Sequence, residues 1–317
     1  MRLVITGGAG FVGARVARLA LERGHDEVAL DDLSTGRADA VPAGATWVEG
    51  DVRDAACVET VLEGADAVLH LAAAVGPRLV AEDPAGTWSR NVEGTATVVR
   101  ACAARGRRLL LASSSEVYGV GPDADAPLSE DDPCRIDAAG RRDVYAISKL
   151  AGEALAFAEH RARWLPMTVV RPFNLVGPGQ GGRYGMVLAR FAEAARAGRD
   201  LEVYGDGLQR RCFLHVDDAA DALLGLLDAS ASEGRIVNLG SDEEVTVLDV
   251  ARRVAARVGR PRGWRHVDFE RVHGEGFPDP RRRRPALDRL RSLLPTWRPS
   301  RTLDDAIDDV LAESLAS

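Results

Sequence analysis

Residues 6–13 read TGGAGFVG and directly follow a short apolar run, LVIT. Gly7, Gly10 and Gly13 have GxxGxxG spacing and stand between this predicted strand and a predicted helix over 11–24. Glycines at such a turn let the backbone approach a pyrophosphate, and the N–H groups and dipole of a helix N-terminus attract the anion. The stretch predicts a dinucleotide-binding turn, with cofactor contacts from Gly7, Gly10, Phe11, Val12 and Gly13.

A carboxylate ends the next predicted strand, EVAL at 27–30. Asp31 lies about 20 residues beyond the glycines, where a carboxylate can accept hydrogen bonds from both hydroxyls of an adenosine ribose. Such a carboxylate repels a 2′-phosphate, which favours NAD, although Arg37 in LSTGR leaves NADP open. Asp51, after a third predicted strand at 46–50, is placed either for the adenine amino group or in solvent. A tight structural turn with a helix-capping Asp is the alternative to the whole arrangement.

Predicted strands and helices alternate along most of the chain. Further strand candidates occupy 67–73, 108–114 and 167–174. Strands that alternate with helices indicate a parallel sheet covered on both faces. We therefore expect an α/β fold: a Rossmann-type doubly wound parallel sheet that binds NAD in residues 1–175, and a smaller C-terminal α/β lobe for substrate in 176–317, with the chain crossing back to the first domain. The expected cofactor site also includes Val52, Leu71 and Ala72 near the strand ends, and Tyr145 and Lys149 further along the chain.

The bulk composition excludes several classes of protein. The 317 residues carry a net charge of −7, which argues against nucleic acid as a partner. No run of about 18 uncharged apolar residues predicts a membrane span, and the first ten residues lack the pattern of a cleavable signal. The four cysteines form no CxxC pair, so a reduced cytoplasmic protein without a metal site is expected.

The segment YAISK at 145–149 predicts the reacting centre. Tyr145 and Lys149 are one helical turn apart on one face. A phenol has a pKa of about 10, but an adjacent ammonium and a nicotinamide cation favour the phenolate. Tyr145 could then take a hydroxyl proton while a hydride leaves the same carbon. An ordinary surface Tyr–Lys pair is the alternative, and the hydroxyl cluster ASSSEVYG at 112–119 makes it less favoured.

Eight segments occur in one order along essentially the whole chain: TGGAGFVG, HLAAAVG, NVEGT, SSSEVYG, YAISK, RPFNLVGP, YGDGLQRRCF and VNLGS. Together they resemble the extended short-chain dehydrogenase/reductase family, in its nucleotide-sugar epimerase, dehydratase and decarboxylase branch. The resemblance implies transient oxidation at the fourth carbon of the sugar by tightly held NAD. Tyr145 is then the base, Lys149 its electrostatic partner and Ser114 the group that orients the hydroxyl. It also implies a homodimer formed through helices over 91–106 and 145–160.

The type of reaction depends on Ser115 and Glu116. The family's 4,6-dehydratases have an Asp–Glu pair at this position, so the missing Asp weighs against dehydration. Decarboxylases of the branch resemble the chain in having Ser-Glu and a later Arg, and DPRRRRPALDRL (279–290) places Arg283 at that position. We slightly favour decarboxylation of UDP-glucuronate over 4-epimerisation of a UDP-hexose or UDP-glucuronate. Diphosphate binding, a solvated charge run and a structural pair with Glu116 remain open for the arginines.

The resemblance also places a nucleotide diphosphate. Asn174 and Arg211 correspond to residues that meet the diphosphate or nucleotide, and guanidinium groups suit phosphate because they bind it in bidentate fashion. Arg183 lies in a Gly-rich loop that is either a substrate lid or a turn without a role. Because UDP is the commonest nucleotide of the branch, a UDP-sugar is expected. An NAD-binding regulator without catalysis is disfavoured because Ser114, Tyr145 and Lys149 are all present.

Overall fold

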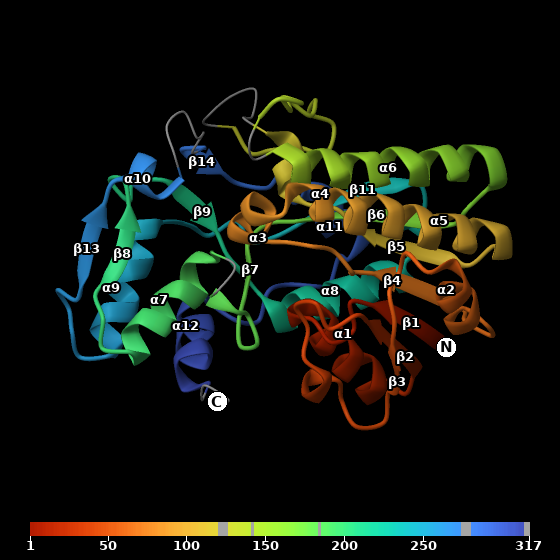
Figure 1. Cartoon of the computed structure of the whole chain (residues 1–317), viewed down its shortest axis with the longest axis horizontal. Coiled ribbons are helices and arrows are strands. Elements are labelled where there is room, and N and C mark those ends of the chain that lie inside the picture. The colour runs from red at the N-terminus through yellow and green to blue at the C-terminus, as the bar shows by residue number, and fades with distance from the viewer. Residues whose placement is uncertain (120–125, 141–142, 183–184, 274–279, 314–317) are drawn as a thin grey trace.

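The computed structural model describes residues 1–119, 126–140, 143–182, 185–273 and 280–313. Its centre is a seven-stranded parallel sheet in the order β11-β6-β5-β4-β1-β2-β3 (Figure 1). All six predicted strands form and belong to this sheet. The strands are almost continuously apolar because helices cover both faces. Their bounds are Arg2–Thr6 (β1), Asp26–Asp31 (β2), Thr46–Glu49 (β3), Ala67–His70 (β4), Arg108–Ala112 (β5), Met167–Pro172 (β6) and Arg235–Leu239 (β11).

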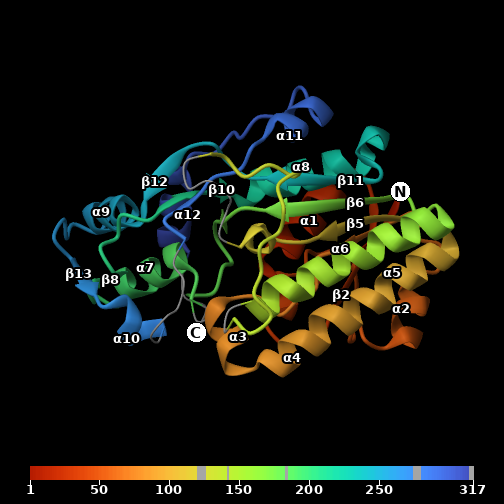
Figure 2. The same ribbon diagram turned by 90° about the horizontal axis from the view of Figure 1, so that it is seen from above.

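Two helix layers bury the faces of the sheet. Side chains alternate between the faces of a strand, so Leu3 and Ile5 of β1 pack with α1 (Phe11–Glu22) and α8 (Val216–Asp228), whereas Val4 belongs to the opposite core. On that second face α5 and α6 lie side by side (Figure 2). The remaining helices around this sheet are α2 (Ala55–Val61), α3 (Pro77–Glu82), α4 (Pro84–Trp88), α5 (Gly94–Arg105), α6 (Asp143–Arg163) and α11 (Asp288–Leu293).

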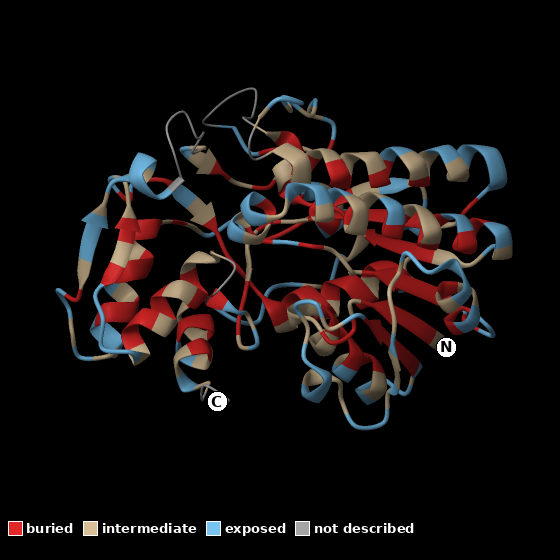
Figure 3. Ribbon diagram, in the orientation of Figure 1, coloured by how far each residue is buried: buried red, intermediate tan, exposed pale blue. Residues whose placement is uncertain are grey.

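A second core forms away from the large sheet. It joins helices and strands from the C-terminal half, and its buried faces are red in Figure 3. In contrast, α8 and β11 come from the same half of the chain but pack with the first core. The second core and the small sheets beside it are formed by β7 (Leu175–Val176), α7 (Val187–Arg196), β8 (Leu201–Tyr204), β9 (Arg210–Cys212), β10 (Leu214–His215), β12 (Glu244–Thr246), α9 (Val247–Arg257), β13 (Trp264–Val267), α10 (Phe269–His273), β14 (Arg282–Arg283) and α12 (Leu303–Ala312).

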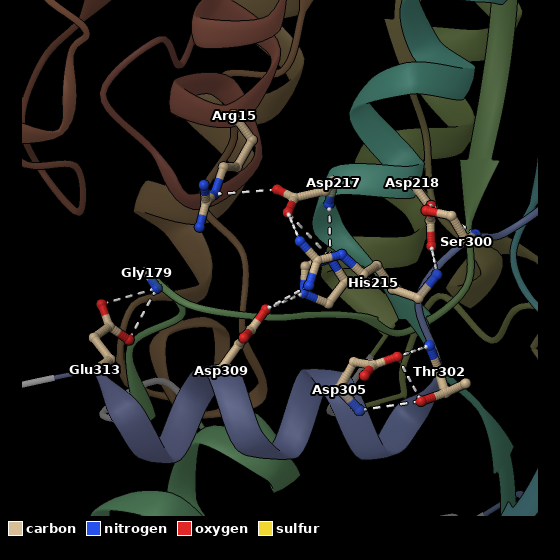
Figure 4. A network of polar contacts seen from close by, with 11 residues as sticks. Arg15, Gly179, His215, Asp217, Asp218, Ser300, Thr302, Asp305, Asp309 and Glu313 are labelled. Atoms are coloured by element: carbon tan, nitrogen blue, oxygen red, sulfur yellow. Dashed lines mark hydrogen bonds and ion pairs between the residues drawn. The ribbon is translucent and has the colours of Figure 1, made fainter.

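Helix α12 connects the two cores through polar contacts (Figure 4). His215 is buried at the end of β10, with Nε2 3.3 Å from a carboxylate oxygen of Asp309 on α12. Its Nδ1 accepts a hydrogen bond from the backbone N–H of Asp217, at the start of α8. At the end of α12, both carboxylate oxygens of Glu313 accept from the N–H of Gly179 at 3.0 Å. The loop after β7 is therefore fixed by a helix that is distant in sequence.

Candidate active site

A cleft opens where β1, β2 and β4 end. All ten residues that the sequence assigns to the cofactor outside helix α6 line this one cleft. They are Gly7, Gly10, Phe11, Val12, Gly13, Asp31, Asp51, Val52, Leu71 and Ala72. Ligands of doubly wound sheets bind beyond the carboxyl ends of the strands, and the position of the cleft agrees with that rule.

The glycine turn is shaped for an anion. Gly7 has a φ of +74°, which a residue with a side chain rarely adopts. A Cβ at Gly13 would lie 1.9 Å from the carbonyl oxygen of Gly7, so only glycine lets α1 start this close to β1. Gly10 is the N-cap, and no side-chain hydrogen bond caps α1 in the described part of the chain. The first N–H groups of α1 therefore fit the pyrophosphate of a dinucleotide.

The two predicted carboxylates line the cleft at the ends of β2 and β3. Asp31 is buried and accepts hydrogen bonds from the N–H groups of Ala9 and Leu33 at 3.1 and 2.9 Å. Burial raises the pKa of Asp31, and these two bonds oppose that effect. Asp51 lines the cleft but is paired with Arg53, whose hydrogen bonds lower the pKa of the Asp51 carboxyl.

Arg37 is the residue that keeps NADP possible as the cofactor. Its Nε donates to a carboxylate oxygen of Asp39 at 2.9 Å, and Arg37 does not line the cleft. The guanidinium thus has an acceptor within its own loop. The carboxylate of Asp31, not this guanidinium, lines the part of the cleft at the end of β2.

Part of the cleft wall was not anticipated from the sequence. Residues 179–181 and Met186 belong to the loop after β7, and Arg90 comes from the π-helical turn Ser89–Glu93. The glycines of GPGQGG were a signal for a mobile or binding loop, but nothing local indicated that the loop faces the dinucleotide turn. The contact of Gly179 with Glu313, 134 residues later in the chain, brings the wall into place.

The hydroxyl cluster and helix α6 meet at the end of β5, the strand next to β4 in the sheet, and neither Tyr145 nor Lys149 lines the cleft. Ser114 follows β5 and hydrogen-bonds Tyr145 in the first turn of α6. Lys149, one turn later, is buried and lies 6.0 Å from the centroid of the Tyr145 ring. Its Nζ donates to the carbonyl oxygen of Ala112 at 2.8 Å. The structure thus brings together the Ser, Tyr and Lys that the sequence assigns to one centre.

Burial dominates the ionisation of this centre in the protein by itself. Burial raises the pKa of Tyr145, and the charge of Glu116 raises it further, while the Ser114 hydrogen bond lowers it. Burial also lowers the pKa of Lys149 to about 8. The protein by itself therefore holds Tyr145 as a neutral phenol, and the expected phenolate depends on the nicotinamide cation as well as on the Lys149 ammonium. The reason is desolvation, which disfavours the charged form of both groups.

Glu116 and Arg283 form an ion pair across 167 residues of sequence. The side chain of Arg283 is 6% exposed, so this arginine is not part of a solvated charge run. It also donates to the carbonyl oxygen of Gly119 at 3.3 Å. Because Glu116 acts electrostatically on Tyr145, the guanidinium stands next to the reacting centre. Both a catalytic and a structural use of the pair are compatible with this geometry.

The predicted nucleotide contacts are more scattered. Asn174, with a φ of +37°, donates from its side-chain amide to the carbonyl oxygen of Cys212 at 2.9 Å. Arg211 lies beside Arg283, since β9 and β14 pair in that register, and it donates to backbone carbonyl groups. Ser115 is buried in the turn after β5. Arg183 lies outside the described residues.

The described residues contain no cluster of three or more His, Cys, Asp and Glu side chains that could hold a metal ion. All four cysteines are free thiols. No helix within the described ranges has the length and apolar character required to cross a membrane.

The model of the NAD dependent epimerase/dehydratase family matches residues 3–240. The chain belongs to this family of enzymes. It is 34% identical to the UDP-N-acetyl-alpha-D-glucosaminuronate decarboxylase of Bacillus cytotoxicus, over 92% of this chain and 91% of the relative. It is 32% identical to the UDP-glucose 4-epimerase of Mycolicibacterium smegmatis, over 97% of this chain and 96% of the relative. The epimerase/dehydratase fold extends over the whole chain: the NAD complex of the Thermus thermophilus UDP-glucose 4-epimerase superposes with a TM-score of 0.86 at 28% identity, covering 98% of both chains.

Family membership confirms the predicted α/β fold and the predicted cofactor, NAD. The relatives include decarboxylases as well as a 4-epimerase, which are the two reactions favoured from the sequence.

Proposed function

We propose that the protein acts on a UDP-sugar through a transient 4-keto intermediate and removes carbon dioxide from a UDP-hexuronate, with UDP-glucuronate as the first candidate. The single observation that carries the decarboxylase assignment is the buried Arg283 paired with Glu116 beside Tyr145. The names of several relatives, which are UDP-glucuronic acid or UDP-N-acetylglucosaminuronate decarboxylases, support it.

The first step is oxidation of the fourth carbon. Ser114 orients the sugar hydroxyl, and Tyr145 accepts its proton. NAD, when bound, takes up the hydride from that carbon and returns it at the end of the reaction. Because burial disfavours the phenolate, Tyr145 needs both the Lys149 ammonium and the positive charge of the nicotinamide to serve as a base.

The new ketone makes the sugar carboxylate a β-keto acid. The bond between the fifth and sixth carbons breaks, its electron pair moves into the enolate at the fourth carbon, and carbon dioxide leaves. A proton must then return to the fifth carbon. Arg283 would bind the sugar carboxylate, and Glu116 would move the proton. Both functions require the pair to separate when substrate binds.

A 4-epimerase is the second candidate, because relatives with that name cover almost the whole chain. Such an enzyme needs only a sugar that rotates between oxidation and reduction. Glu116 and Arg283 would then be a structural pair. The predicted diphosphate contacts of Asn174 and Arg211 apply to either reaction.

Assembly and location are further parts of the proposal. The face formed by α5 and α6 is proposed to pair with a second copy of the chain, as the family resemblance implies, and the free thiols support a reducing, cytoplasmic location. Light scattering during size-exclusion chromatography tests the dimer, and a mass equal to one chain contradicts it.

Substrate incubation separates the two reactions. We would incubate the purified protein with UDP-glucuronate, UDP-N-acetylglucosaminuronate, UDP-glucose and UDP-N-acetylglucosamine and follow the products by NMR. The proposal expects a UDP-pentose from one of the hexuronates and no change in the neutral hexoses. Inversion at the fourth carbon without loss of carbon supports the epimerase. Release of bound NAD without any product supports a non-catalytic regulator.

A further inference from the structure

Lys149 is the sole lysine in the sequence, and the other 40 positively charged Lys and Arg positions are all arginines. Arginine stays charged in any protein environment, whereas a buried ammonium can lose its proton. Lys149 is buried, and its own hydrogen bond goes to the neutral carbonyl group of Ala112. A separate feature of the fold must therefore keep this ammonium charged near neutral pH.

Glu153 lies one helical turn beyond Lys149 on α6 and is 3% exposed. Its two carboxylate oxygens accept from Nε and Nη2 of Arg171, on β6, at 2.9 and 2.7 Å. Ser113, the neighbour of Ser114, donates a further hydrogen bond to the same carboxylate. The carboxylate is thus held in one orientation by Arg171 on β6 and by Ser113 directly after β5.

We propose that Glu153 is a positioning residue whose fixed carboxylate keeps the Lys149 ammonium charged at the reacting centre. The proposal rests on the assignment of Lys149 to that centre, but its test below needs no substrate. The electrostatic effect of Glu153 raises the pKa of Lys149 against the larger effect of burial. Their spacing on α6 places the side chains of Lys149 and Glu153 on the same face of the helix.

The other charged or titratable groups around the pair do not replace Glu153. Tyr145 on α6 is held neutral by burial. His70 on β4 is buried between Thr6 and Thr95, and burial lowers its pKa to about 3, so it is neutral as well.

The groups beside Glu153 itself are positively charged or neutral, so they cannot stabilise the charge of the Lys149 ammonium. Arg171 carries positive charge, so removing only the Glu153 carboxylate would leave an unpaired cation that disfavours a second one. Cys134 lies 3.6 Å from Nη2 of Arg171, and burial raises the pKa of its thiol, which keeps it protonated.

The single lysine makes a direct measurement possible. Protein produced with 13C- and 15N-labelled lysine gives one side-chain signal, and its chemical shift reports the protonation of Lys149 from about pH 4 to about pH 10. In wild type we expect a midpoint near the value of about 8 that burial gives Lys149. In Glu153→Gln the midpoint should fall by about 1 to 3 pH units, the effect of removing an opposite charge at close range.

Glu244→Gln is the matched control. Glu244 forms a comparable two-pronged pair with Arg282, is 11% exposed, and lies on β12 in the other part of the molecule. Its loss should reduce stability without moving the Lys149 midpoint. A midpoint unchanged in Glu153→Gln, or shifted equally in both variants, overturns the proposal.

A double variant covers the case in which Glu153→Gln does not fold. Glu153→Gln with Arg171→Met removes both buried charges, so no unpaired charge remains in the core. We expect its Lys149 midpoint below that of wild type, and an unchanged midpoint overturns the proposal. Because no substrate is used, a wrong assignment of the reaction would leave these results as they are.

Discussion

Glu27 lies in the strand that carries Asp31 and provides a quantitative test of the fold. It is fully buried on β2, and neither carboxylate oxygen has a hydrogen-bond partner in the described part of the chain. Burial raises its pKa from 4.5 to about 7, with a smaller contribution from Asp26. The native state therefore holds a proton that the unfolded chain releases at lower pH.

The sign and size of the effect of Glu27 on the free energy of unfolding follow from the linkage between proton binding and folding. Between pH 4.5 and about 7 the folded state binds more protons than the unfolded state, so the free energy of unfolding falls as the pH rises. Each pH unit of difference corresponds to about 1.4 kcal/mol, which gives a total of about 3 kcal/mol. The bound proton of Glu27 stabilises the fold fully below pH 4.5, the pKa in the unfolded chain. This stabilisation is lost as the pH rises above about 7, the pKa in the folded protein.

Glu27→Gln removes this titration while it keeps the size of the side chain. We would measure urea unfolding of wild type and variant at several pH values from about 4 to about 8, a range that brackets both pKa values. The free energy of unfolding of the variant relative to wild type should rise by about 3 kcal/mol across the range. Glu49→Gln, at an exposed position on β3, should show a flat difference. A flat difference for Glu27→Gln as well would mean that its carboxylate is hydrated or paired, and would refute the reasoning.

Three substitutions test the site itself. Tyr145→Phe should reduce turnover by at least about 100-fold, the usual contribution of a general base, while NAD released on denaturation stays at the wild-type amount; retained turnover would remove Tyr145 from the mechanism. Glu116→Gln should stall a decarboxylase after oxidation, seen as accumulated NADH absorbance, whereas a variant that turns over normally indicates that the pair with Arg283 is structural. Asp31→Ala should weaken NAD binding by about 1 to 3 kcal/mol, the cost of losing a charged hydrogen-bond acceptor, as measured by calorimetry on apoprotein; unchanged affinity would place the ribose elsewhere.

The sheet and the cofactor cleft could be predicted because their signals are local. Apolar runs of strand length precede each turn, and GxxGxxG spacing between strand and helix has few other structural uses. The pair Tyr145 and Lys149 also follows from helical spacing alone. These features depend on residues within a few positions of one another.

The remaining features depend on long-range packing. Nothing local to Glu116 indicates a contact with Arg283, since β14 reaches it only by pairing beside β9. The cleft wall at 179–181 depends likewise on α12. The raised pKa of Tyr145 is caused mainly by burial, and burial cannot be read from the spacing of Tyr145 and Lys149.

The fate of the sixth carbon of the sugar tests the proposed reaction most directly. The protein would be incubated with UDP-glucuronate, and in parallel with UDP-N-acetylglucosaminuronate, each labelled with 13C at that carbon. We expect the label to appear as carbon dioxide and bicarbonate in step with an unlabelled UDP-pentose from one of the two. Label that stays in the sugar with both substrates, with or without inversion at the fourth carbon, would contradict decarboxylation.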